Sequence, residues 1–506
     1  MGILKKLAGE TAVYGLTMVL GRTLNYLMVP IYTAVFAEGK YAVQAELYSY
    51  VAFLNVLYTY GMETAFFRYA TKTHLQKTFN QIVSAHLFTS LLFSMVLFLS
   101  SDALALGLGY GGQGVFLRWL AGVLALDTLS AIPLARLRLE GRAWRFGLVK
   151  LSNILLSLGL NLFFLVFCPW VQAGAWVGAQ ALVGWVYAPE IGVGYIFLAN
   201  LLASGVQWLL LLPAYRGFRL VWHWPTFRPI LWYAYPLVFT GLAAMISEVL
   251  DRPLLKYYLP DNFYPGQTAL EAMGVYAACY KLSIFMSIGI QAFKYAAEPF
   301  FFTRAEDPKA PALFAQVMHY FVIVAVFVWL FVSLHLDVFK WLFLRRESYW
   351  AGVGVVPILL LANLFLGVYY NLAIWFKLTE QTYFGTWFAG AGAVITLVAN
   401  LGLVPFFGYH GAAWATLMAY GTMMGLCYAY GQKHFPVPYD WVSMVKYILL
   451  AGVLILAALY LPLSPGLTRQ ALLEVFLLIF VSVVYFSEKG KRLLPPAKEN
   501  AQEAKE

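Results

Sequence analysis

Apolar runs long enough to cross a membrane follow one another along the whole chain, separated by short polar stretches. A membrane-spanning helix needs about twenty mainly apolar residues, and this rule predicts fourteen helices here. They lie near residues 10–36, 44–70, 80–101, 114–137, 146–168, 190–213, 230–258, 271–300, 312–336, 350–376, 382–404, 411–430, 441–461 and 467–487. We therefore expect an all-α integral membrane protein without a separate soluble domain.

Two of the predicted helices carry the same stripe of polar side chains, spaced by four residues. The stripes are Asn55, Thr59 and Glu63 in the second span, and Ser283, Ser287 and Gln291 in the eighth. Residues at this spacing share one face of a helix. Polar atoms in a bilayer are costly unless they face a partner or water. Each stripe alone is compatible with hydrogen bonds to a neighbouring helix, whereas two matching copies favour a pseudo-symmetric cavity between two halves.

The similarity between the two halves extends beyond these stripes. Arg68-Tyr69-Ala70 matches Lys294-Tyr295-Ala296 after a slip of two residues, and Arg22 to Asn25 aligns with Glu248 to Asp251. The repeat predicts a six-helix lobe over residues 1–220 and a second over 221–437, related by an axis along the membrane normal. Two additional transmembrane helices over 438–488 and a disordered polar tail over 489–506 complete the predicted organisation.

Composition and charge support a membrane protein and define its orientation. Of 506 residues, 62% are hydrophobic and only 11% charged, and the mean hydropathy is +0.72, whereas soluble domains carry about 25% charged residues. The net charge of +10 does not indicate nucleic-acid binding, because the cations cluster in short loops between spans. Most of these loops lie on the side that carries both termini. The positive-inside rule then predicts a multi-pass membrane protein with both termini in the cytoplasm.

A basic residue stands near the middle of the first span. Arg22 at this depth costs about 2.5–3.5 kcal/mol on insertion scales and must face something polar. Asn25 shares its face of the helix. One interpretation is a structural ion pair with Glu63 or Glu248, and the other is a cation that faces a ligand.

Three charged residues follow one another in the seventh span. Glu248 and Arg252 lie one turn apart with the acid first, which favours a local pair. Asp251 then needs another partner, for which Lys281 is a candidate. Pro253 follows and is expected to bend the helix, since it removes a backbone hydrogen bond.

Asp127 is the single acid in the middle of the fourth span, and it is a candidate for binding a coupling proton or sodium ion. The alternative is a hydrogen bond that stabilises helix packing. Glu63 is the second ion-coupling candidate. We find no phosphate-binding loop, no paired metal ligands and no nucleophile with a base. The three cysteines are isolated. The sequence therefore predicts no enzyme activity, no catalytic residues, no cofactor and no metal site.

Asp251-Arg252, followed by GVYAACYKL and AEPFF, together with the fourteen predicted spans, resembles bacterial polysaccharide-repeat flippases. These belong to the multidrug/oligosaccharidyl-lipid/polysaccharide (MOP) exporter superfamily. The resemblance covers essentially the whole chain and is most specific over Tyr276 to Phe302. It implies a place in the bacterial cytoplasmic (inner) membrane. It also implies that undecaprenyl-pyrophosphate-linked oligosaccharide, an O-antigen, capsule or exopolysaccharide unit, moves from the cytoplasmic to the periplasmic leaflet by alternating access. It also implies other polysaccharide-assembly membrane proteins as partners.

Residues and resemblance together define a predicted substrate-binding set. It consists of Arg22, Asn25, Asn55, Thr59, Glu63, Glu248, Asp251, Arg252, Lys281, Ser283, Ser287 and Gln291. The mixture of acids and bases differs from the cationic cavity of lipid II flippases, which share the fourteen-helix plan. A lipid II flippase and a drug or cation antiporter remain alternatives, although drug-extruding relatives typically have twelve spans. A membrane glycosyltransferase or polymerase is a further alternative, but no long external loop with paired carboxylates supports it.

Overall fold

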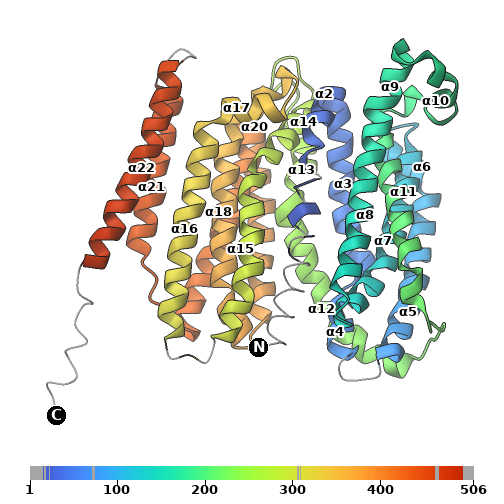
Figure 1. Ribbon diagram of the computed structural model, residues 1–506, viewed down its shortest axis with the longest axis horizontal. Helices are drawn as coiled ribbons and strands as arrows, with labels where there is room; N and C mark the ends of the chain where they lie inside the picture. The colour runs from blue at the N-terminus through green and yellow to red at the C-terminus, as the bar shows by residue number, and fades with distance from the viewer. Residues whose placement is uncertain are drawn as a thin grey trace.

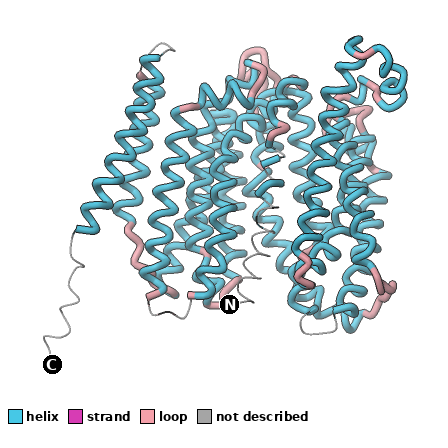
Figure 2. The backbone as a smooth tube through the Cα atoms, in the orientation of Figure 1, coloured by secondary structure: helices cyan, strands magenta, loops and turns pink. Residues whose placement is uncertain are grey.

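The computed structural model describes residues 15, 17, 19–21, 23–24, 26–70, 75–304, 307, 309–461 and 467–493. Within these ranges every regular element is a helix (Figure 2). Eleven helices there are long and apolar enough to cross a membrane. This confirms the predicted all-α membrane fold. Below, the upper end of the molecule is the end that carries α2, α10 and α17 in Figure 1, and the lower end is the one that carries α4.

The first bundle is built around α7, on which α5 and α11 pack, while α8 packs on α11. Its α-helices are α2 (Val29–Val35), α3 (Glu38–Thr59), α4 (Met62–Ala70), α5 (Leu75–Leu99), α6 (Ser101–Gly107), α7 (Gly114–Leu139), α8 (Ala143–Leu162), α9 (Cys168–Trp170), α10 (Gln180–Val186) and α11 (Gly194–Leu211). Short π- or 3₁₀-helical turns are η1 (Phe163–Phe167), η2 (Val171–Ala175), η3 (Val177–Ala179), η4 (Pro189–Ile191) and η5 (Leu212–Tyr215).

The second bundle is built around α20, which contacts α12, α13 and α18. Its α-helices are α12 (Trp224–Val249), α13 (Asp251–Tyr258), α14 (Ala269–Tyr280), α15 (Ile284–Thr303), α16 (Ala310–Leu334), α17 (Leu336–Phe343), α18 (Val356–Leu372), α19 (Ile374–Leu378) and α20 (Tyr383–His434), with 3₁₀ turns η6 (Lys281–Ser283) and η7 (Glu347–Val355). Two more helices, α21 (Trp441–Tyr460) and α22 (Leu467–Leu493), pack against the outside of α16 (Figure 1).

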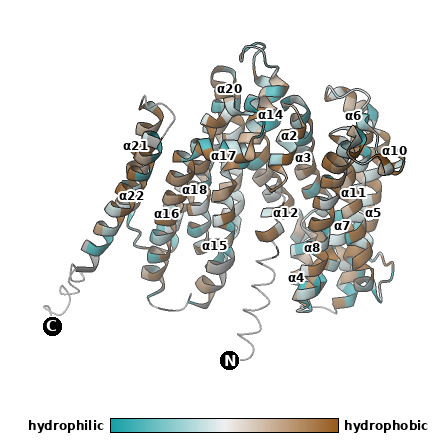
Figure 3. Ribbon diagram, turned by 45° about the horizontal axis from the view of Figure 1, so that its top comes forward, coloured by the Kyte–Doolittle hydropathy of each residue, from teal (hydrophilic) through white to brown (hydrophobic). Residues whose placement is uncertain are grey.

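Hydrophobic residues occur along much of the length of the helices (Figure 3). On α5, for example, Phe88, Leu91 and Met95 are exposed on the surface of the bundle. A continuous apolar face of this kind is unfavourable in contact with water but favourable in contact with lipid. The outer helices of both bundles therefore present a surface suited to the hydrocarbon of a bilayer.

The second predicted span is broken in two. The backbone of Tyr60 is left-handed (φ 30°, ψ 44°) and Gly61 follows with φ 72°, which ends α3 and starts α4. A Cβ atom on Gly61 would lie 2.9 Å from the carbonyl oxygen of Ala234 in α12. Glycine therefore permits both the positive φ and the close approach of the two bundles at this point.

The long helix α20 contains two of the predicted spans, 382–404 and 411–430. Its backbone leaves the helical region at Gly408 (φ 56°, ψ −134°). A Cβ on Gly411 would lie 2.4 Å from the carbonyl oxygen of Leu403. Residues eight positions apart in a straight helix are about 12 Å apart along the axis, so the chain turns back here.

Other predicted boundaries stand as follows. The helix is interrupted at Leu250, between α12 and α13 and three residues before Pro253, although the backbone at Leu250 keeps helical angles (φ −74°, ψ −20°). The bend expected from Pro253 therefore remains a prediction. Helix α22 continues to Leu493, beyond the predicted start of the polar tail, and residues 494–506 lie outside the described residues. Much of the first predicted span is also outside them. The count of fourteen and the lobe boundaries therefore remain predictions.

Candidate functional site

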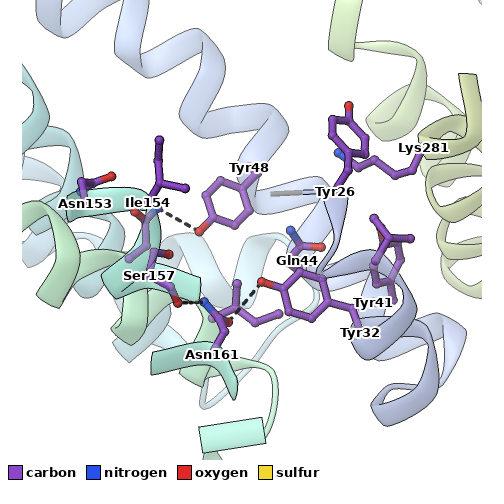
Figure 4. Close-up of a pocket in the computed structure, with 13 residues that line it drawn as sticks. Tyr26, Tyr32, Tyr41, Gln44, Tyr48, Asn153, Ile154, Ser157, Asn161 and Lys281 are labelled. Carbon is purple, nitrogen blue, oxygen red and sulfur yellow. Dashed lines mark hydrogen bonds between the residues drawn. The ribbon is translucent and has the colours of Figure 1, made fainter. Parts of the chain in front are cut away.

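A polar cavity of about 420 Å³ lies between α3, α8 and α11, beside α2 and the turn η6 (Figure 4). Tyrosines and side-chain amides account for most of its lining. The lining residues are Tyr26, Val29, Tyr32, Tyr41, Gln44, Tyr48, Asn153, Ile154, Ser157, Asn161, Ile196, Asn200 and Lys281. All but Lys281 come from the N-terminal part of the chain, so one residue of the second bundle reaches the cavity of the first.

Local helix geometry places these side chains together. Tyr41, Gln44 and Tyr48 share one face of α3 because they are three and four residues apart. On α8, Asn153, Ser157 and Asn161 recur every four residues and form a third polar stripe with the spacing of the two predicted ones. The same search for polar four-residue spacing would have found this stripe.

Hydrogen bonds connect the walls of the cavity. The Tyr32 hydroxyl donates to Asn161 Oδ1 at 3.1 Å, and Asn161 Nδ2 donates to the carbonyl oxygen of Ser157 at 2.7 Å. Across the cavity, Asn200 Nδ2 donates to the Tyr48 hydroxyl at 3.0 Å. The Oε1 atom of Gln44 is buried and has no hydrogen-bond partner among the described residues. An unpaired buried acceptor beside a cavity is a group that a bound donor would satisfy.

The cavity is cationic rather than acidic over the part of its lining that the structure describes. Lys281 supplies the only formal charge there, and its Nζ lies 5.5 Å from the centre of the Tyr26 ring. Arg252, just outside the lining, is close enough to Lys281 and Tyr41 for electrostatic interaction. Arg252 is itself paired with Asp251, and Glu248 also lies within electrostatic range of Lys281. Within the described lining, one lysine and no carboxylate favour an anionic or neutral polar ligand over a cationic one.

The charges of the seventh span are arranged differently from the sequence prediction. Asp251 is 2% exposed; it accepts a hydrogen bond from the Tyr276 hydroxyl at 2.6 Å and lies 3.5 Å from Arg252. Its partners are thus Tyr276 and Arg252 rather than Lys281. Arg252 donates to the backbone carbonyl of Glu248 at 2.9 Å, not to its exposed carboxylate. Asp251 and Arg252 are adjacent in the chain at the start of α13, and Tyr276 of α14 reaches the same carboxylate.

The second predicted stripe faces another helix. Ser283 is 1% exposed and accepts from Asn363 Nδ2 of α18 at 3.2 Å, while Ser287 donates to Asn363 Oδ1 at 3.4 Å. Gln291 is partly buried further along α15. Over Ser283 and Ser287 the stripe therefore makes the hydrogen bonds between helices that the alternative interpretation described.

The first predicted stripe is interrupted by the break at Tyr60. Thr59 donates to the backbone carbonyl of Asn55 at 2.7 Å, and Asn55 itself is exposed. Beyond the break, the carboxylate of Glu63 forms an ion pair with Arg138 of α7. Arg22 and Asn25 lie outside the described residues, so their predicted roles remain predictions.

The ion-coupling candidate Asp127 lies inside the first bundle. It accepts a hydrogen bond from Ser204 of α11 at 2.8 Å, and Lys150 of α8 is within electrostatic range. The sequence analysis did not identify Lys150. Among the residues that the structure describes, no group of three histidine, cysteine or acidic side chains is placed to hold a metal ion.

These features define an integral membrane protein of two helical bundles with a polar cavity beside their junction. No protein-family model and no curated protein sequence matches the chain. Solved structures do match its fold. A lipid II flippase MurJ in an inward closed conformation superposes with a TM-score of 0.68 at 12% identity, over 93% of this chain and 98% of that one.

An inward-facing multidrug resistance MATE family transporter of the MOP superfamily superposes with a TM-score of 0.63 at 14% identity, over 84% of this chain and 95% of that one. An outward-facing conformation of such a transporter gives a TM-score of 0.57 with the same identity and coverage. The chain therefore has the fold of MOP-superfamily transporters and flippases.

Proposed function

We propose that this chain is a flippase for polyprenyl-pyrophosphate-linked oligosaccharide, which it moves between the leaflets of the inner membrane by alternating access. The observation that carries the proposal is the cavity of tyrosines, amides and one lysine, in a fold shared with the lipid II flippase MurJ. The predicted lobes, 1–220 and 221–437, are the bodies that would move. The lower end would face the cytoplasm, because most loop cations lie there.

The lining suits the head group of such a substrate. Asparagine and glutamine side chains both donate and accept hydrogen bonds, as sugar hydroxyls do. Tyrosine rings add apolar faces on which sugar rings stack, with a hydroxyl at the edge. Lys281 supplies positive charge for a pyrophosphate at the side of the cavity that faces the second bundle. The polyprenyl chain would remain in the bilayer, beside the apolar outer surface of the bundles.

Transport of this kind needs no chemical step in the protein. An inside-negative potential of 100 mV favours outward movement of two negative charges by about 4–5 kcal/mol. A pyrophosphate of that charge would therefore be driven toward the outer leaflet once a polar path is available. The protein has only to expose its cavity to one side at a time.

Lipid II is the second candidate, favoured by the fold shared with MurJ. It also joins a polyprenyl pyrophosphate to sugars, so the described lining accommodates either head group. Extrusion of cationic drugs, the other alternative, is less compatible with the cavity, because the described lining has one lysine and no carboxylate. A cation would be repelled rather than held there.

Proteoliposomes containing the purified full-length chain test the proposal with three cargoes. These are a polyprenyl-pyrophosphate-linked neutral oligosaccharide, lipid II, and ethidium as a cationic drug. We expect potential-dependent translocation of the lipid-linked oligosaccharide, followed by exposure of its sugar to an external lectin, and no ethidium transport. Faster movement of lipid II would favour the second candidate, and ethidium transport alone would contradict both flippase assignments.

A further inference from the structure

A short apolar helical segment, Val177–Val186, lies at the upper end of the first bundle, outside the cavity lining. It comprises η3 and α10, and it projects from the outer side of that bundle in both views (Figures 1 and 3). Its ten residues are too few to cross the hydrocarbon of a bilayer. An apolar helix of this length is either buried in a protein core or lies at a membrane interface.

One face of the segment Val177–Val186 is buried and the other is exposed. Ala179 and Val183, four residues apart, are buried and pack in the apolar core of the bundle. On the other face Leu182, Trp185 and Val186 are exposed, and the Trp185 side chain is 90% exposed. The segment is therefore not a core helix, because the described part of the chain leaves its outward apolar face uncovered.

Backbone geometry and hydrogen bonds hold the segment in this orientation. Gly174 has φ 93°, which a glycine adopts without strain, and the preceding helix ends there. Gln180 Nε2 donates to the carbonyl oxygen of Val171 at 3.4 Å, and the Ala188 amide donates to the Tyr195 hydroxyl at 2.6 Å. The apolar face could not turn inward without breaking these contacts.

The exposed face continues an apolar stripe of the preceding helix, which runs through α8, η1 and α9. The exposed members of this stripe are Leu155, Leu162, Val166 and Trp170. Their spacings of seven and four residues place them on one side of the helix. Trp176, just before the segment, is exposed as well. A surface suited to lipid therefore extends from α8 onto the segment.

The composition of this region favours lipid over a protein partner. No charged side chain lies between Lys150 and Glu190, and the structure describes every residue in that range. Specific protein interfaces surround an apolar centre with a polar rim. The exposed positions from 173 to 186 are instead all alanine, glycine, tryptophan, valine or leucine. Tryptophan is enriched where a protein meets the head groups of a bilayer.

The length of the preceding helix places the segment at the level of the head groups. Helix Ala143–Ala175 has 33 residues, or about 50 Å at about 1.5 Å per residue. The hydrocarbon of a bilayer is about 30 Å thick, and the bilayer with its head groups is about 40–45 Å thick. A helix that begins at the lower membrane surface therefore crosses the hydrocarbon and ends in the upper head-group layer, where the segment follows.

We propose that Val177–Val186 is an interfacial anchor, which lies in the upper head-group layer with Leu182, Trp185 and Val186 in contact with the acyl chains. Its partner is the lipid surface itself. Anionic head groups are not required, because residues 151–189 carry no cation. The anchor follows α8, which lines the cavity, and so holds the cavity-bearing bundle at a fixed depth. The inference needs no particular cargo, since it concerns lipid contact alone.

Spin labels at Leu182→Cys and Val186→Cys test the anchor in the full-length protein, reconstituted into phosphatidylcholine vesicles. All three native cysteines are buried, so background labelling is low. Power saturation compares collisions with oxygen, which is concentrated in lipid, and with a nickel chelate, which stays in water. We expect the oxygen-to-nickel ratio at both positions to be several-fold higher than at Asp261→Cys, an exposed position after α13. Leu91→Cys, on the exposed apolar face of α5, gives the reference value for lipid contact.

Each other result would overturn the proposal. A ratio as low as that of Asp261→Cys would show that the segment lies in water. Few collisions with either reagent would show that a second copy or another protein covers it. Vesicles of equal parts phosphatidylcholine and phosphatidylglycerol should give the same ratio, because the segment has no cation. A several-fold higher ratio in the anionic vesicles would contradict the proposed charge-independent contact.

A charge placed on the exposed face sharpens the test. Trp185→Glu should lower the ratio at a Leu182→Cys label several-fold, because a carboxylate draws this face toward water. Glu190→Gln is the matched control, since it also changes one charge, at an exposed position beyond the segment. It should leave the ratio unchanged. A Leu91→Cys label in the Trp185→Glu protein should keep its lipid value, which shows that the bundle is folded. A folded Trp185→Glu protein with an unaltered ratio at Leu182→Cys would contradict the inference.

Discussion

Helices α8 and α20 each carry an asparagine that donates to a backbone carbonyl four residues earlier, yet the asparagine of α8 lines a cavity and the asparagine of α20 is packed in the interior. Asn161 donates to the carbonyl of Ser157 at 2.7 Å, and Asn400 donates to the carbonyl of Thr396 at the same distance. Asn161 also accepts from Tyr32 and faces the cavity. Asn400 is 0% exposed, and its Oδ1 has no partner among the described residues.

The difference arises from what packs against each helix. In α20, the residue four positions before Thr396 is Gly392. A Cβ atom on Gly392 would lie 2.6 Å from the sulfur of Met423. In α8, the residue four positions before Ser157 is Asn153, which lines the cavity. Similar local patterns thus form a cavity wall in the first bundle and a close-packed interface in the second. We infer that the first bundle holds the polar part of the cargo and the second supports it through Lys281.

The largest effect is expected for Lys281, the single contribution of the second bundle to the cavity. Lys281→Met removes the charge at similar volume and should lower the initial rate of lipid-linked oligosaccharide transport about 10- to 100-fold, as expected for losing a charged hydrogen bond. Lys281→Arg should retain most activity. Lys294→Gln, which removes a cation of α15 outside the cavity lining, is the control for proteoliposome assays. Normal transport by Lys281→Met would remove the second bundle from the site.

Cysteine accessibility tests the contrast between open and packed stripes directly. Ser157→Cys should react with a water-soluble thiol reagent, because Ser157 lines the cavity. Thr396→Cys, at the matching place in the second bundle, should react only after denaturation, because Thr396 is 0% exposed. Mass spectrometry of labelled protein measures both. Equal labelling of the two positions would show that the second bundle also opens to water.

A smaller effect should separate the two asparagines. Asn161→Leu removes the bond from Tyr32 and should reduce transport about 2- to 10-fold, the usual range for a neutral hydrogen bond. Asn400→Leu removes a buried amide whose Oδ1 is unpaired, so it should leave transport unchanged and not lower the thermal unfolding temperature. If Asn400→Leu impaired transport as strongly as Asn161→Leu, the proposed division between the bundles would be wrong.

The smallest effect concerns an upper-end ion pair of the second bundle. Burial raises the pKa of Asp337, but hydrogen bonds and charge from Lys340 and Arg469 outweigh it and hold that pKa below its ordinary value. A folded-state pKa below the unfolded one contributes stability above the unfolded pKa, and this contribution is lost as pH falls through the folded pKa. Asp337→Asn should therefore destabilise the protein by at most about 1 kcal/mol at pH 7.

Thermal unfolding at pH 7 and at pH 3 measures this effect. The difference between Asp337→Asn and wild type should shrink at the lower pH, since the wild-type carboxylate is then becoming protonated. Transport at neutral pH should be unchanged, in keeping with a structural role. A difference that grew in acid would contradict the assigned direction of the pKa.

Several site residues could be found from spacing alone, and others could not. The search for polar residues four apart identified Ser283 and Ser287, and applied to the fifth span it would have identified Asn153, Ser157 and Asn161. It could not tell that Ser283 and Ser287 meet Asn363, because that contact joins positions 80 and 76 residues apart in the chain. Lys256 continues the four-residue spacing of Glu248 and Arg252, whereas Glu46 carried no such signal. Spacing could not tell that Glu46 and Lys256 form an ion pair, because they are 210 residues apart in the chain.

The sequence by itself determined that the chain is an all-α membrane protein and where most of its helices lie. Helix formation in a bilayer depends on local apolar length and on backbone hydrogen bonds within one segment. The tertiary structure decided which polar face opens into a cavity, which closes on a neighbour, and which charges pair across the bundles. Those outcomes depend on close approach between distant helices, as at Gly61 against α12 and at Gly392 against Met423. Packing volume at such contacts is a property of two segments at once, so no pattern within either segment determines it.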